Sequence, residues 1–146
     1  MRGIIRELGA TGAGNADVTV LDLEAGLENL KRGTPRHIDW MVVVAEPYFR
    51  ALETAVRTAE LAQELGIPSV GIVANKVRDD RDERAVRSVF ESRDLAVLAV
   101  VPFDPAVVEA DRAPAALIDV APDSPAVRAI AELVEALGAS GNGSWS

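Results

Sequence analysis

Polar residues that could bind a ligand follow four apolar runs of this sequence. Runs that are apolar at nearly every position are typical of parallel strands covered on both faces. Ligands bind at the carboxyl ends of such strands, so the residues that follow the runs are the candidates for chemistry. Each strand end taken alone is more often structural, but the four together favour a ligand-binding edge. In chain order they are Asp22 with Gly26, Glu46 with Pro47, Asn75 with Lys76, and Pro102 with Phe103 and Asp104.

The first of these strand ends has the residue types of a magnesium and phosphate site. A carboxylate at the end of a buried strand, here Asp22, can hold a water on Mg²⁺ beside a triphosphate. Gly26 has no Cβ, so a backbone N–H there can approach a phosphate closely. A loop turn with a helix-capping aspartate explains the same pair without any ligand.

The third strand end has the chemistry of a purine reader. The carboxamide of Asn75 can both donate to and accept from a purine edge, and Lys76 can lay its methylene stem along a base. Guanine readers carry Asn-Lys-x-Asp, whereas the fourth position here is Arg78 and Asp79 comes one residue late. Guanine specificity is therefore not supported, and an asparagine that bonds only the backbone remains the alternative.

Two other features are weaker candidates for a functional site. His37 is the only histidine, and no Ser–His–acid arrangement can be built around it. Residues 9–16, GATGAGNA, have the Gly-x-x-x-x-Gly spacing of a phosphate-binding loop but lack its Lys and Ser/Thr. This stretch follows a predicted short helix and leads into a strand, the reverse of a phosphate loop, so it is interpreted as a turn.

The order of elements predicts an α/β domain built on a mainly parallel sheet of about four strands, with helices on both faces. A helix with apolar residues at helical spacing separates the second and third runs, and a shorter one with Ala85, Val89 and Phe90 on one face separates the third and fourth. Ser124 and Pro125 predict the cap and first turn of a last helix through Leu137. The domain is expected to cover residues 1–138, with a flexible tail at 139–146. The predicted strands are Val18–Leu23, Met41–Ala45, Ser69–Ala74 and Leu95–Val101.

Composition excludes several function classes. The net charge of −8 opposes binding to nucleic acid or to anionic membranes. Without cysteine there is no disulfide framework and no thiolate metal site, and we predict no metal site made by this chain alone. No apolar stretch is long enough to span a bilayer, so a cytoplasmic protein is expected.

Four blocks of the sequence resemble the MinD/ParA/NifH-like deviant P-loop ATPases. They are VTVLDLEAGLENLKRGT, VVVAEPYFRALETA, GIPSVGIVANKVRD and VPFDPAVVEAD. The first block resembles most the CooC-type ATPases that insert nickel during maturation of carbon monoxide dehydrogenase. The resemblance implies a partial P-loop NTPase fold that uses ATP and Mg²⁺. By position, Asp22 matches the Walker B-type aspartate and Gly26 the switch II glycine. Asn75 matches the adenine-contacting asparagine with Lys76 beside it, Pro102, Phe103 and Asp104 match the loop over the base, and Glu24 and Glu28 match an acidic switch II signature.

The resemblance covers the second half of the family fold. The family's lysine-bearing P-loop and its Cys-x-Cys motif have no counterpart in these residues. Most triphosphate affinity comes from that P-loop, so we expect this chain alone to bind ATP weakly or not at all, and not to hydrolyse it. The expected partners are a second copy or a P-loop-bearing protein, and a metalloenzyme client similar to carbon monoxide dehydrogenase. The alternative is a non-catalytic module that pairs with a full-length ATPase or a metalloenzyme.

Overall fold

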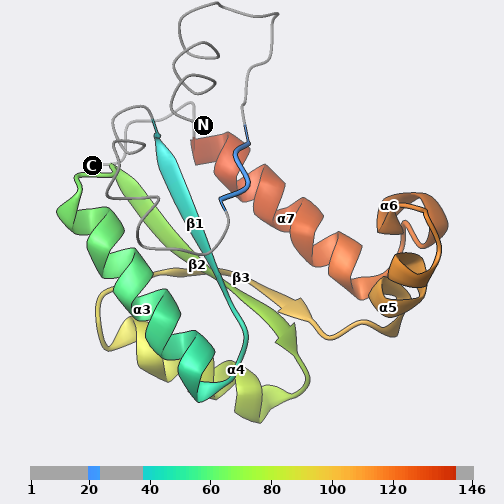
Figure 1. Ribbon diagram of the computed structural model, residues 1–146, viewed down its shortest axis with the longest axis horizontal. Helices are drawn as coiled ribbons and strands as arrows, with labels where there is room; N and C mark the ends of the chain where they lie inside the picture. The colour runs from blue at the N-terminus through green and yellow to red at the C-terminus, as the bar shows by residue number, and fades with distance from the viewer. Residues whose placement is uncertain (1–19, 24–37, 141–146) are drawn as a thin grey trace, which may run out of the picture.

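The computed structural model describes residues 20–23 and 38–140 (Figure 1). Within these residues three parallel strands form one sheet in the order β1-β2-β3. Two helices connect consecutive strands, and three more follow the last strand. The elements are β1 Trp40–Ala45, α3 Phe49–Glu64, β2 Ser69–Val77, α4 Asp80–Glu91, β3 Val97–Pro102, α5 Pro105–Arg112, α6 Leu117–Val120 and α7 Pro125–Ser140.

The predicted α/β class, the parallel sheet and the helices on both of its faces are confirmed. Three of the four predicted strands are present. The remaining prediction, Val18–Leu23, lies partly outside the described residues, and its described part, residues 20–23, adopts no regular secondary structure. β2 extends three residues beyond the predicted Ala74, so Asn75 and Lys76 lie inside the strand.

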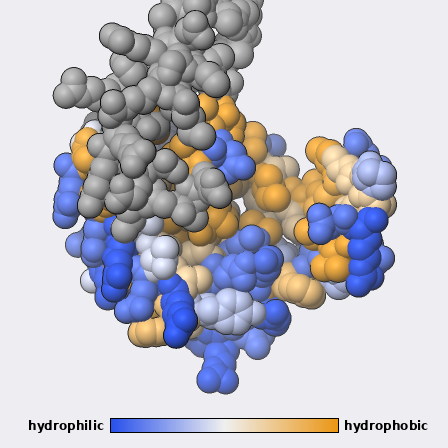
Figure 2. Space-filling model, in the orientation of Figure 1, coloured by the Kyte–Doolittle hydropathy of each residue, from blue (hydrophilic) through white to orange (hydrophobic). Residues whose placement is uncertain are grey.

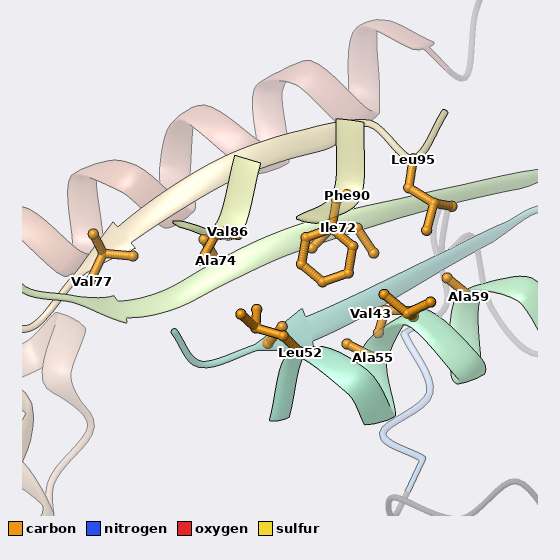
Figure 3. Packing of buried hydrophobic residues seen from close by; sticks show 12 residues of the cluster. Val43, Leu52, Ala55, Ala59, Ile72, Ala74, Val77, Val86, Phe90 and Leu95 are labelled. Carbon is orange, nitrogen blue, oxygen red and sulfur yellow. The ribbon is translucent and has the colours of Figure 1, made fainter. Parts of the chain in front are cut away.

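Helices α3 and α4 pack on one face of the sheet (Figures 1 and 3). Phe90 of α4 is fully buried there, beside Ile72 of β2 and Leu95. Of the residues predicted on the inward face of α4, Phe90 is buried and Val89 packs against the core, whereas Ala85 is exposed and Val86 is completely buried instead. Valine at position 86 lies one helical turn before Phe90, so these two residues form the contact face.

Helix α7 covers the opposite face of the sheet, where it packs on β3 (Figure 1). Ala126 of α7 is buried there with Val73 and Val101 of the sheet. The predicted cap is confirmed, since Ser124 Oγ accepts the backbone N–H of Val127 at 3.3 Å. The helix runs to Ser140, past the predicted end and into the predicted tail, whose last six residues lie outside the described part.

Helices α5 and α6 were not predicted from the sequence. Both are short, and α6 has no buried residue. Among the residues described, no helix is long and apolar enough to cross a bilayer.

Candidate functional site

The carboxyl ends of all three strands meet at one edge of the sheet, as parallel pairing requires. Glu46 follows β1, Asn75 and Lys76 lie near the end of β2, and Phe103 follows β3. Side chains from these different strands contact one another across the edge. The structure therefore brings together the second, third and fourth predicted strand ends.

A bulge in β2 shapes the middle of this edge. Ala74 pairs with Val100 and Val77 with Pro102, so the two residues between them on β2 lie opposite a single residue of β3. Lys76 has a φ of 57°, in the left-handed region that residues with a Cβ rarely adopt. Asn75 Oδ1 accepts the backbone N–H of Lys76 at 3.0 Å. A backbone bond of this kind is what the alternative without a ligand predicts for Asn75. Bulges of this kind re-aim side chains, and they are frequent beside binding sites.

An ion pair links the ends of β1 and β2. Lys76 Nζ donates to Glu46 Oε1 at 2.5 Å, and both side chains are partly open to solvent. Such an exposed pair contributes about 0–1 kcal/mol to stability. The pair joins side chains from two strand ends across the edge of the sheet.

Arg78 forms a cluster with two aromatic rings that the sequence analysis did not identify. Its guanidinium carbon lies 5.8 Å from the ring centroid of Tyr48 and 5.2 Å from that of Phe103, both within cation–π range. Arg78 also donates a hydrogen bond to the Tyr48 hydroxyl at 2.5 Å. This hydrogen bond raises the pKa of the Arg78 guanidinium above its ordinary value. Arg78 is exposed and precedes α4, and its guanidinium lies near rings that follow two other strands.

Asp104 joins two helices at the end of β3. Its carboxylate accepts the backbone N–H of Ala106 at 2.9 Å and that of Ala126 at 3.1 Å, which are the first-turn amides of α5 and α7. The side chain is buried, with 7% of its surface exposed. The hydrogen bonds from Ala126, Ala106 and Ser124 hold the pKa of Asp104 below its usual range. The carboxylate is thus engaged by the protein itself, and it anchors the loop that carries Pro102 and Phe103.

The first predicted strand end is only partly described. Asp22 is described and exposed, whereas Gly26, Glu24, Glu28 and His37 lie outside the described residues. Within the described ranges no three His, Cys, Asp or Glu side chains gather as metal ligands would. The magnesium role of Asp22 stays a prediction.

The sequence is similar to ATP-binding proteins over most of its length. A family model described as "AAA domain" matches residues 39–111, half of the chain. An uncharacterized ATP-binding protein of Methanocaldococcus jannaschii is 39% identical over 95 residues, which is 65% of this chain and 37% of that protein. The carbon monoxide dehydrogenase accessory protein CooC of Rhodospirillum rubrum is 36% identical over 106 residues, which is 73% of this chain and 40% of CooC. The chain thus spans about two fifths of the length of these relatives.

Solved structures of MinD and ParA proteins share the fold. The septum site-determining protein MinD of Pyrococcus horikoshii, complexed with Mg-ADP, superposes with a TM-score of 0.76 at 22% identity, over 94% of this chain and 57% of MinD. A ParA family ATPase of Chlorobium tepidum gives a TM-score of 0.57 at 21% identity, over 71% of this chain and 43% of that protein.

The matched family model, the CooC relative and the shared fold agree with one another and with the strand-end pattern of the sheet. The chain therefore belongs to the AAA-domain family, with a sequence similar to that of CooC and a fold shared with MinD.

Proposed function

We propose that this chain is the adenine-nucleotide-binding part of a CooC-like ATPase that takes part in nickel insertion into a carbon monoxide dehydrogenase. In this proposal Asn75, Lys76 and the Pro102–Asp104 loop hold the base at the carboxyl edge of the sheet. Hydrolysis requires a P-loop, which these 146 residues do not contain.

The observation that carries the proposal is the convergence of three strand ends on one edge. The bulge at Asn75 and Lys76 turns two polar residues out of the regular strand pattern. Phe103 lies beside them with 42% of its surface exposed, and its loop is anchored through Asp104. A planar base requires this combination of a polar edge reader and an exposed ring. The relationship to a CooC protein and to ATP-binding proteins supports the same ligand class.

The phosphate end of the ligand would depend on groups from elsewhere. At the described edge, Lys76 is paired with Glu46 and Arg78 with Tyr48, so both cations already have partners. Asp22 would hold Mg²⁺ only together with phosphate oxygens, because one carboxylate is not a cation site. Bound Mg-ATP would supply the phosphoryl group for transfer, while the residues of this chain bind and orient its base.

Reconstitution with a P-loop-bearing partner tests the proposal. The experiment combines the purified chain with the separately expressed P-loop segment of a CooC-like protein and measures phosphate release from Mg-ATP. We expect turnover only when both parts are present. The Asn75→Ala variant should lower it, whereas Arg84→Ala, an exposed position on α4, should not. A complex that forms without turnover would contradict the proposal.

The nickel client can be tested in the same reconstituted system. Apo carbon monoxide dehydrogenase is incubated with nickel, Mg-ATP and the two parts, and recovery of its activity is followed. We expect recovery to depend on both the chain and ATP. Recovery that is equally fast without the chain would exclude the proposed role in nickel insertion.

A second candidate function is a non-catalytic module that pairs with a full-length ATPase or a metalloenzyme. Apolar side chains exposed on the α7 side of the sheet favour it, namely Val44 at 60%, Ile130 at 47% and Val134 at 61%. A stable complex without any gain in ATP turnover is the result this alternative predicts.

A further inference from the structure

We propose that Tyr48, Arg78 and Phe103 form the surface on which the purine base stacks, with Arg78 as the residue that positions the two rings. This inference rests on the proposed nucleotide site and adds two residues, Tyr48 and Arg78, to it. At that site, stacking on the rings supplies affinity, and Asn75, which reads the edge of the base, supplies selectivity.

Tertiary structure alone creates this cluster. Tyr48 follows β1, Arg78 follows β2 and Phe103 follows β3, so each strand end contributes one member. The guanidinium of Arg78, on the central strand, reaches the ring on either side. Its hydrogen bond to the Tyr48 hydroxyl fixes the direction of the tyrosine side chain as well as its distance.

The two rings remain half open to solvent despite these contacts. Tyr48 has 48% and Phe103 42% of its surface exposed, although aromatic rings contribute most when buried. Phe103 is also held by the backbone, because its N–H donates to the Val77 carbonyl at 2.8 Å. Exposed rings held in fixed positions are the arrangement on which nucleic-acid bases stack.

The surface suits the base of a nucleotide. A guanidinium plane and an exposed aromatic ring both stack on bases. Stacking by itself does not select among bases, since every base has a π-face. The preference for a purine therefore comes from Asn75, the edge reader of the proposed site.

The single tyrosine of the chain makes a direct test possible. The full chain is labelled with ¹³C on tyrosine and ¹⁵N on the backbone, and it is titrated with ADP and then with GDP in the presence of the unlabelled P-loop segment used for reconstitution. We expect the Tyr48 ring signals to move with both nucleotides. Arg78→Ala should weaken both affinities by about fivefold or more, leaving their ratio unchanged. Asn75→Ala should change the ratio.

Matched variants separate stacking from a merely structural effect. Tyr48→Phe keeps the ring and should retain most of the affinity, whereas Tyr48→Ala should lose it. Arg84→Ala removes an exposed arginine of α4 and should leave both affinities unchanged. If Arg78→Ala fails to fold, as judged by circular dichroism, the two Tyr48 variants still decide the question.

The outcomes distinguish this inference from the proposed function. Backbone signals that move on ADP addition while the Tyr48 ring signals stay fixed would overturn the stacking surface and leave the nucleotide site standing. A loss of affinity in Arg78→Ala for one nucleotide only would also overturn it. No response to either nucleotide in the presence of the P-loop segment would overturn both proposals.

Discussion

At the scale of single residues, Asp104 has the best-defined energetic role in the structure. Its two carboxylate oxygens accept first-turn amides of α5 and α7, helices that lie far apart in the sequence. Asparagine at this position keeps one acceptor and turns an NH₂ group toward the other amide, which then loses its bond. We expect Asp104→Asn to lower the thermal midpoint by several degrees at neutral pH, measured by circular dichroism. Asp111→Asn, on the exposed side of α5, is the matched control and should have no such effect.

The same residue predicts a pH dependence with a definite sign. Because folding lowers the pKa of Asp104, its contribution to stability is present above the ordinary value of 3.8 and is lost as the pH falls through the folded value. The difference in thermal midpoint between wild type and Asp104→Asn should therefore be constant near neutrality and narrow below about pH 3.8. A difference that stays constant into strong acid would contradict this role of the carboxylate.

The backbone strain at Lys76 should be separable from its role in nucleotide binding. Its φ of 57° is unfavourable for a residue with a Cβ, and Asp94 has the same φ at the turn before β3. Replacing either residue by glycine relieves about 1 kcal/mol of backbone strain. We expect Asp94→Gly to stabilise the chain, and Lys76→Gly to be neutral or stabilising after loss of its ion pair with Glu46, as measured by urea unfolding. Only Lys76→Gly should weaken ADP binding, and equal binding by both variants would exclude Lys76 from the site.

At the scale of elements, the Leu98 side chain of β3 occupies the space beside Gly71 of β2. A Cβ added at Gly71 would lie 2.4 Å from Leu98 Cδ1 and 2.6 Å from its Cγ. Gly71→Ala should therefore destabilise the chain by about 1–3 kcal/mol, the usual cost of overpacking. Urea unfolding of Gly71→Ala, Leu98→Ala and the double variant gives the coupling free energy between positions 71 and 98. Gly71→Ala should lower the free energy of unfolding much less when Leu98 is also replaced by alanine. An equal loss in both backgrounds would show that the Leu98 side chain does not clash with the alanine.

At the scale of the whole molecule, the two faces of the sheet are covered unequally. Apolar residues are exposed along α7 and on α5 and α6 (Figure 2). Helices α3 and α4 close one face around the larger core cluster. The α7 side leaves Val44, Ile130 and Val134 exposed, and an apolar area of this kind favours association.

Charged residues on α7 should suppress that association. We expect wild-type chain to self-associate with rising concentration, and the double variant Ile130→Glu with Val134→Glu to remain monomeric in analytical ultracentrifugation. Stability should change by no more than about 0.5 kcal/mol, because these are exposed positions. Ala131→Glu adds charge to α7 at another exposed position and is the control. Unchanged self-association of the double variant would place the contact elsewhere.

Local sequence pattern was sufficient for the fold class, three of the strands, and the helices α3, α4 and α7. Buried parallel strands and amphipathic helices leave periodic apolar signals that depend only on neighbours in the chain. The same pattern located Asn75, Lys76 and Phe103, because strand ends are readable from where an apolar run stops. It also predicted the Ser124 cap, a contact between residues three apart.

Tertiary structure decided the contacts that join distant strand ends. The bulge at Lys76 arises from the pairing of β2 with β3, and the bonds of Asp104 to α7 span 22 residues. Neither leaves a periodic signal in the sequence. Arg78 was the clearest case, since in sequence it opens a charged run and in space it lies between Tyr48 and Phe103. The sequence by itself determined which elements form and where each one stops. Only the folded sheet, by bringing three carboxyl ends to one edge, decided which side chains meet there.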